Sequence, residues 1–200
     1  MSVRAAVVIL ASAVVAVALL AGCESAPPTR PMFPEIAFAH LAPLNFDAAK
    51  VEVVNEYVAP LKRPNVEHEM PLRPSAAAER WAKDRVKAAG TSNRSLRVTI
   101  KNARVVESEL KKTTGLRGMF TTDQAQRYDA ELEMLIEVRN DRGFREGSAS
   151  AVSRRSTTVP ENITINDREK EYFKLVEDMM TDINREMERS IREHMAKFLR

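Results

Sequence analysis

The chain has 200 residues, of which 44% are hydrophobic and 30% are charged, with 6 glycines and 10 prolines. This composition excludes collagen, low-complexity disorder and a protein with several membrane spans, and it predicts one globular domain of modest size. Lysine and arginine total 31 against 28 aspartate and glutamate residues, for a net charge of +3, and there is no long basic block. We therefore expect no nucleic-acid partner.

The N-terminus carries the most specific motif in the chain. A run of small and branched, mainly apolar residues follows Arg4 and has the length of a transmembrane helix or of a signal-peptide core. It ends in Leu20-Ala21-Gly22-Cys23, which matches the bacterial lipobox: a branched apolar residue, two small residues that leave room for a processing peptidase, and the cysteine that receives lipid. The motif predicts cleavage after Gly22. An uncleaved anchor with an incidental cysteine is the alternative.

Cys23 is the only cysteine, so the sequence predicts no disulfide, no redox pair and no thiolate metal site. We expect no cofactor, only a diacylglycerol and an N-acyl chain such as palmitate on Cys23. Several acyl chains anchor a protein stably, since each buried methylene contributes about 0.8 kcal/mol. Glu24 stands where an inner-membrane retention signal has aspartate, so we expect the periplasmic face of the outer membrane of a Gram-negative bacterium. The inner membrane is the alternative.

The domain organisation follows from this boundary. We expect a signal peptide at 1–22, a lipidated cysteine with a proline-rich tether at 23–34, and a single periplasmic domain at 35–200. The tether holds four prolines and little periodic apolar character, which is typical of an extended spacer.

The first part of the domain is predicted to contain two strands and a helix. Branched and aromatic residues favour strands at 35–39 and 50–58, with a loop between them. A proline-rich connection follows. Ser75 is then expected to cap a helix that runs to Ala89 and stops at Gly90.

The middle of the domain alternates between apolar and polar residues with the period of a half-buried strand. This alternation predicts a strand at 95–110 and, most clearly, another at 128–138. Turn residues at 140–143 lead into 145–159, which we expect to be the hairpin partner of the preceding strand.

The last segment is predicted to be one long helix, with Asn166 as N-cap, Glu169 three residues on, and an end near Leu199. Its apolar residues recur every three or four positions and form one stripe. The element order is therefore β-β-α-β-β-β-α. We expect an α+β fold in which a small, mostly antiparallel sheet carries two helices packed on one face.

His68 lies between Glu67 and Glu69, a combination that could transfer a proton or form half of a metal site. On an extended chain the two neighbouring carboxylates point away from the imidazole, and His40 and His194 are the only other histidines. No GxSxG, SxxK or glycine-rich phosphate loop occurs. We therefore expect a solvated loop, no metal site, no catalytic residue and no enzymatic activity.

Two surface features are candidate contact sites. Leu116, Met119 and Phe120 lie among glycines between two predicted strands, and such a loop can insert into lipid or into a partner's groove. The alternative is that they tuck under the sheet. Four arginines near the hairpin are candidates for contact with acidic lipid headgroups or lipopolysaccharide phosphates, although a charged, solvated sheet edge explains them equally well: Arg142, Arg145, Arg154 and Arg155.

The lipobox followed by this element order resembles small periplasmic lipoproteins, namely the ABC-transport auxiliary lipoproteins and the lipopolysaccharide-assembly lipoprotein, whose domains pack helices on one face of a sheet. The chain is also similar to a lipoprotein group of alphaproteobacteria through Arg80-Trp81-Ala82, residues 115–123 and Thr158-Val159-Pro160-Glu161. The resemblance implies the fold and a role in the envelope, and it transfers no active-site or binding residue.

These features together predict a non-enzymatic, membrane-anchored periplasmic lipoprotein that serves as an accessory subunit of an envelope transport or assembly complex. Its expected partners are the membrane, through the lipid anchor, and an envelope protein complex. One alternative is a carrier that binds a lipid or amphiphile between the sheet and the last helix. Another is an envelope hydrolase that uses His68 with Glu67 or Glu69.

Overall fold

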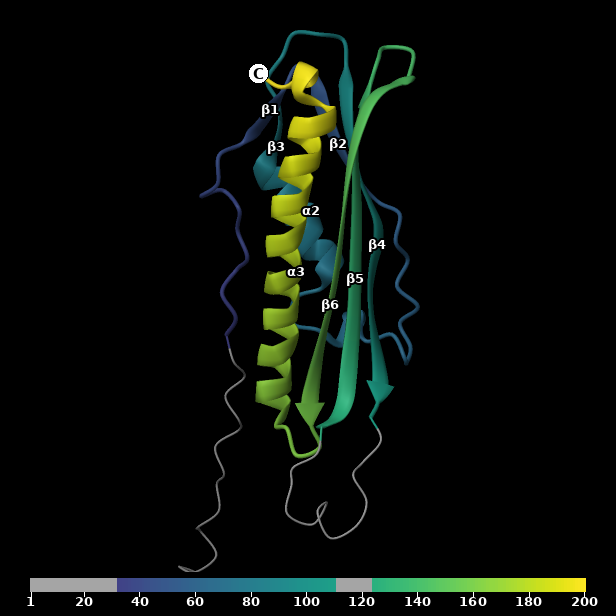
Figure 1. The fold of residues 1–200 in the computed structure, drawn as a ribbon, viewed down its shortest axis with the longest axis vertical. Coiled ribbons are helices and arrows are strands. Elements are labelled where there is room, and N and C mark those ends of the chain that lie inside the picture. The colour runs from purple at the N-terminus through teal and green to yellow at the C-terminus, as the bar shows by residue number, and fades with distance from the viewer. Residues whose placement is uncertain (1–31, 111–123) are drawn as a thin grey trace, which may run out of the picture. The chain divides into compact units, whose positions relative to one another are not determined.

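The computed structural model describes residues 32–110 and 124–200, all within the unit formed by residues 31–200. The elements follow one another along the chain in this order (Figure 1): β1 (Leu44–Phe46), β2 (Lys50–Asn55), the short 3-10 helix η1 (Glu67–Glu69), α2 (Pro74–Arg85), β3 (Val86–Ala88), β4 (Ser95–Glu109), β5 (Gln124–Arg139), β6 (Arg145–Pro160), α3 (Ile165–His194) and η2 (Ala196–Phe198). The predicted α+β fold class is confirmed.

The main sheet has four strands in the order β2-β4-β5-β6. β4 and β5 are antiparallel, as are β5 and β6, whereas β2 runs parallel to β4. The sheet is therefore mostly antiparallel, as predicted. A second, two-stranded parallel sheet pairs β1 with β3, and the sequence analysis did not predict it.

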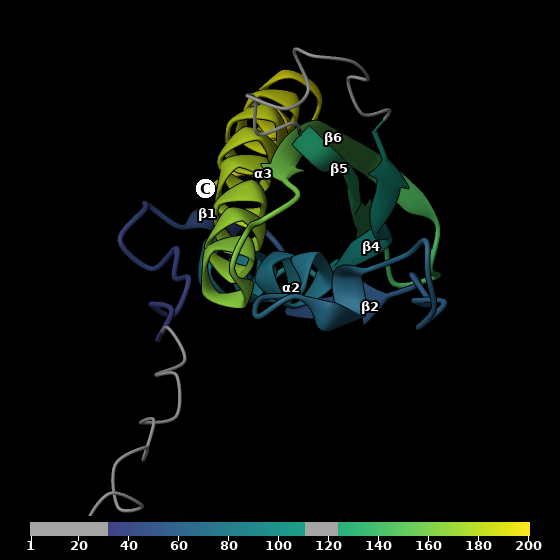
Figure 2. The ribbon, with the colours of Figure 1, turned by 90° about the horizontal axis from the view of Figure 1, so that it is seen from below.

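Both helices pack on the same face of the main sheet. In Figure 2 the sheet curls, with α2 and α3 on its inner side. The alternating apolar residues of β4 and β5 point toward the helices, and the stripe of α3 closes over them, so that this layer is fully buried: Leu96, Val98, Ile100, Leu132, Met134, Ile136, Met179, Ile183 and Met187. The side chains that alternate along the strands and those that recur every three or four residues on α3 therefore pack in one core.

Two polar contacts join α2 to α3. The indole Nε1 of Trp81 donates to Asn184 Oδ1 at 2.9 Å, and the buried guanidinium of Arg85 donates to Glu188 Oε2 at 2.8 Å. Arg85 also donates to the carbonyl oxygen of Ala42. Trp81 and Arg85 are one turn apart on α2, and their partners are one turn apart on α3. The two contacts together therefore align the helices.

The predicted strand at 35–39 is wrong. This segment is extended but pairs with no strand, because the amide of Phe38 donates instead to Asp84 Oδ2 on α2 at 2.9 Å. The strand forms a few residues later, as β1, within the stretch predicted to be a loop. The following strand, β2, ends at Asn55 rather than at residue 58.

The helix α2 differs from the prediction at both ends. Pro74 occupies the first turn and Arg73 the cap position, so Ser75 is not the N-cap. The helix ends at Arg85 rather than at Ala89, because the next residues leave the helix to pair with β1, and the amide of Ala89 donates to the carbonyl oxygen of Phe46 at 2.9 Å.

The helix α3 starts and ends earlier than its motif predicts. Thr164, not Asn166, is the N-cap, since its Oγ1 accepts from the amide of Asp167 at 3.1 Å. The α-helix ends at His194. The C-terminus then folds back onto β1, where the carbonyl oxygen of Phe198 accepts from the amide of Asp47 at 2.8 Å.

Gly90 is required by a close approach of two backbone segments. A Cβ atom built there would lie 2.6 Å from Asp47 Cα and 2.8 Å from the amide nitrogen of Ala48. Gly143 has a positive φ of 82° but free space around it.

We expect Gly90→Ala to destabilise the protein by about 2–3 kcal/mol, since backbone atoms must shift to admit the methyl group. The matched control, Gly143→Ala, is expected to cost about 1 kcal/mol through backbone strain alone. Urea unfolding of both variants measures the difference, and an equal or smaller loss for Gly90→Ala contradicts the packing analysis.

Candidate functional site

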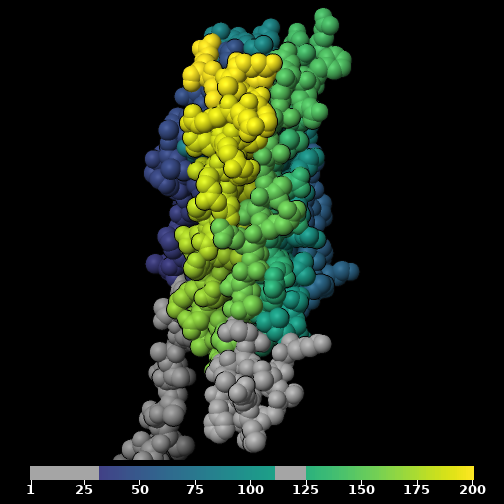
Figure 3. All heavy atoms as spheres, viewed as in Figure 1, coloured from purple at the N-terminus to yellow at the C-terminus, as the bar shows by residue number. Residues whose placement is uncertain are grey.

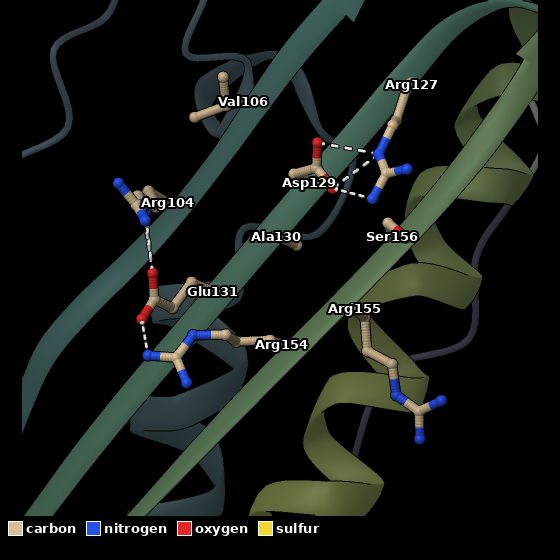
Figure 4. A pocket seen from close by; sticks show the side chains of 9 residues that line it. All are labelled: Arg104, Val106, Arg127, Asp129, Ala130, Glu131, Arg154, Arg155 and Ser156. Carbon is tan, nitrogen blue, oxygen red and sulfur yellow. Dashed lines mark hydrogen bonds and ion pairs between the residues drawn. The ribbon is translucent and has the colours of Figure 1, made fainter.

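A groove of about 460 Å³ lies on the main sheet, across β4, β5 and β6. Arginine and carboxylate side chains dominate it (Figure 4), and the residues that line it are Arg104, Val106, Arg127, Asp129, Ala130, Glu131, Arg154, Arg155 and Ser156. Most of these positions alternate with the buried residues of the same strands, so most of the lining belongs to the outer face of the sheet, away from the helices.

The centre of the groove is a row of three charged residues on three adjacent strands. Arg104 on β4 is in register with Glu131 on β5, which is in register with Arg154 on β6. Glu131 accepts from Arg104 Nη2 at 2.6 Å and from Arg154 Nη2 at 2.7 Å. One carboxylate thus holds two guanidinium groups, and the row carries one net positive charge.

The electrostatics of the row favour ionised Glu131. Burial raises the pKa of its carboxyl, but the hydrogen bonds from Arg104 and Arg154 outweigh burial, so that the pKa lies below its ordinary value of 4.5. The arginines stabilise the charged form. The row therefore contributes its full stability above about pH 4.5 and loses it as the pH falls through the lowered pKa.

The other arginines of the groove are paired differently. Arg127 forms an ion pair with Asp129, at 2.8 Å, along the same strand. Arg155 extends to α3, where its Nε donates to Asp182 Oδ2 at 2.6 Å, and this hydrogen bond lowers the pKa of the Asp182 carboxyl. Guanidinium groups with unused donors bind carboxylates or phosphates, so the groove has the chemistry of an anion-contacting surface.

The four arginines predicted to lie together near the hairpin do not form one cluster, because the structure separates them into two pairs. Arg142 and Arg145 lie at the turn between β5 and β6, whereas Arg154 and Arg155 lie about 30 Å along β6 at roughly 3.4 Å per residue. The sequence analysis missed Arg104 and Arg127, which occupy polar positions of the alternating strands. The pairing of strands brings Arg104 and Arg154 onto the same carboxylate, and the order of residues along the chain does not reveal this proximity.

The structure places His68 in η1, not on extended chain. The buried carboxylate of Glu67 accepts from the hydroxyl of Tyr57 at 2.8 Å and from the amide of Val105 at 3.1 Å, and burial together with this contact raises the pKa of Tyr57. Glu67 is therefore turned inward, and only Glu69 lies near the imidazole, at 3.8 Å. In residues 32–110 and 124–200, no group of three or more metal-ligating side chains is placed to hold an ion.

The lipobox residues Leu20, Ala21, Gly22 and Cys23, and the contact candidates Leu116, Met119 and Phe120, lie outside the described residues. Their roles remain predictions. None of the helices in the described part of the chain has the length and apolar character needed to span a bilayer.

The residues that precede β1 pack against the two helices. The ring of Phe33 stacks on that of Phe173 in α3, with 5.0 Å between centroids, and Ile36 and Leu41 pack against the core. Glu35 forms an ion pair with Arg80 of α2. Residues 33–41 therefore form a strap on α2 and α3.

No family model matches the sequence, and no curated protein matches it. Among solved structures, rare lipoprotein B from Shewanella oneidensis is similar at 13% identity and a TM-score of 0.32, over 70% of this chain and 92% of that chain. A DUF330 protein from Xanthomonas campestris is similar at 10% identity and a TM-score of 0.32, over 82% and 93%. A minor lipoprotein from Acinetobacter baumannii is similar at 11% identity and a TM-score of 0.34, over 76% and 96%.

We expect Arg154→Ala to raise the pKa of Glu131 toward 4.5, because one of the two guanidinium groups that stabilise the carboxylate is lost. The free energy of unfolding at neutral pH should fall by less than about 1 kcal/mol, since Arg154 is exposed. NMR titration of the side-chain carboxyl measures the pKa. The control, Arg142→Ala, should leave it unchanged, and an unaltered pKa in Arg154→Ala argues against the row.

Proposed function

We propose that the protein is a non-enzymatic lipoprotein, anchored through Cys23 at the periplasmic face of the outer membrane, that serves as an accessory subunit of an envelope transport or assembly complex. The lipobox supports the anchor. The protein contacts of the described domain are proposed to come from its charged outer surfaces rather than from an internal site.

The observation that carries this proposal is the closed layer between α3 and the sheet. Met179, Ile183 and Met187 are fully buried against the inner face of the sheet. A carrier that holds an acyl chain in this layer needs apolar surface that is open to a ligand. Here that surface is occupied by the protein's own side chains, which favours a role through protein contacts over the carrier.

The outer face of the sheet supports the same role. Its row of Arg104, Glu131 and Arg154 is rigidly held by strand register, and the exposed guanidinium groups retain free donors. Such groups are common at protein interfaces because they form directional contacts with carboxylates and carbonyl oxygens. We propose this groove as one contact surface for the complex.

The strap fixes where residues 33–41 lie on the domain. Phe33 lies ten residues after Cys23 and stacks on Phe173, near the start of α3. The start of α3 follows the end of β6, and that end of β6 pairs with the first residues of β5. The strap therefore begins toward the end where β4 finishes and β5 begins, opposite to the β5–β6 hairpin (Figure 1).

We expect Cys23→Ala to abolish acylation, because the chain has no other cysteine. Without lipid, the signal segment is the only attachment of the chain to the membrane. Cleavage of that segment at an alternative site should then release the domain into the soluble periplasmic fraction. Labelling with a palmitate analogue and fractionation of the envelope measure both effects. The control, Ser25→Ala, should leave acylation and membrane retention unchanged.

Labelled palmitate on the Cys23→Ala variant, or an unlabelled wild-type chain in the membrane fraction, contradicts the anchor. The complex is tested separately, by photo-crosslinking in cells from the position of Arg154. Adducts with envelope transport or assembly proteins are expected, and recovery of a lipid or glycan alone contradicts the accessory role.

A further inference from the structure

The turn between β5 and β6 is held rigidly by its own hydrogen bonds. Asn140 Oδ1 accepts from the amides of Arg142 and Phe144, both at 3.0 Å. The backbone of Asn140 also accepts from the amide of Gly143 at 3.0 Å, and its amide donates to the carbonyl oxygen of Phe144 at 2.9 Å. Gly143 supplies the positive φ that closes the turn. The tip, defined as residues 140–145, thus has one fixed shape.

This rigid tip presents a large aromatic side chain to solvent. Phe144 is 68% exposed, although burial of a phenylalanine is favourable and a turn tolerates polar residues in its place. Figure 3 shows the hairpin projecting beyond the neighbouring surface. An aromatic ring carried on a fixed turn requires little ordering of the backbone on binding, which is characteristic of residues that anchor protein interfaces.

The charges around the ring are mainly positive and incompletely paired. In the described part of the chain Arg142 has no ion pair. Arg145 is 59% exposed and is 3.5 Å from Glu137, whose other carboxylate oxygen already binds Arg139 at 2.6 Å. Asp141 is the only carboxylate of the tip. A surface that complements the tip therefore combines an apolar pocket with carboxylates at its rim.

The small apolar area of the tip argues for a protein partner rather than a membrane. Phe144 is the one aromatic residue of residues 140–145, and its ring is 68% exposed. A single ring gives little apolar area, whereas the binding of a peripheral helix or loop to a membrane grows with the apolar area that it buries.

We propose that the tip docks into an acidic-rimmed apolar pocket of a partner protein, with Phe144 filling the pocket and Arg142 and Arg145 pairing with carboxylates at its rim. This inference rests on the proposed accessory function for the existence of a partner. It adds the surface that is used and the chemistry that recognises it.

The test is made with the full-length, lipidated protein in its own cells. A photo-crosslinking phenylalanine analogue replaces Phe144, and the crosslinked peptide of the adduct is identified by mass spectrometry. We expect a protein adduct whose crosslinked segment carries apolar residues next to at least two aspartates or glutamates. The control places the same analogue at Ile165, an exposed position at the start of α3 outside both the tip and the groove, and should not give this adduct.

Charge is tested in the same strain. Arg142→Glu with Arg145→Glu should reduce the adduct at least tenfold, whereas Arg142→Lys with Arg145→Lys should retain most of it, because the positive charges remain. Lys174→Glu, which reverses an exposed charge on α3 outside both the tip and the groove, should leave it unchanged. Equal unfolding midpoints of the purified variants show that the fold is intact.

Several outcomes overturn the proposal: no adduct from position 144, an adduct that survives charge reversal, an adduct with lipid only, or an adduct with a second copy of this chain. Each of these leaves the proposed anchor standing if Cys23→Ala loses its acylation, and leaves the accessory role standing if position 154 captures an envelope protein. Failure of the hairpin inference is thus distinguishable from failure of the proposed function.

Discussion

The burial of one stripe of α3 against the inner face of the sheet is the constraint on which the rest of the structure depends. Exposure of either surface to water is unfavourable, because burial of apolar surface lowers the free energy of folding by about 25 cal/mol per Å². Met179, Ile183 and Met187 are fully buried where the two surfaces meet. α2 completes the same layer, and its contacts through Trp81 and Arg85 set its position against α3.

Because the inner face is taken up by packing, charged residues lie on the outer face of the sheet and on the exposed side of α3. On α3 they pair with neighbours three or four residues away, as Lys174 does with Asp178, whereas on the sheet strand register assembles the row of Arg104, Glu131 and Arg154. The hairpin tip differs, because it exposes an aromatic ring on a rigid turn without covering it. The buried layer therefore provides stability, while the surfaces that we propose for recognition are the polar outer face and the tip.

The sequence predicted the parts of the fold that depend on local patterns. The alternation at 128–138 and the stripe of α3 identify β5 and the last helix, because each periodicity reports which side chains face the core. β1 and β3 have three residues each, too few to show a period, and they form only because distant segments meet. The groove has the same origin: its arginines are dispersed along the chain, and only the pairing of strands assembles them.

The strap of residues 33–41 has a mechanical consequence. Under the proposed anchor, tension on the tether would act first on the stacked rings of Phe33 and Phe173, then on the contacts with α2, and on the strands only afterwards. Release of the strap from the helices would lengthen the tether by about 30 Å, at roughly 3.3 Å per residue, while the hydrogen-bonded sheet stays intact. Under the anchor proposed above, the reach of the tether would thus be set by a few side-chain contacts rather than by unfolding of the domain.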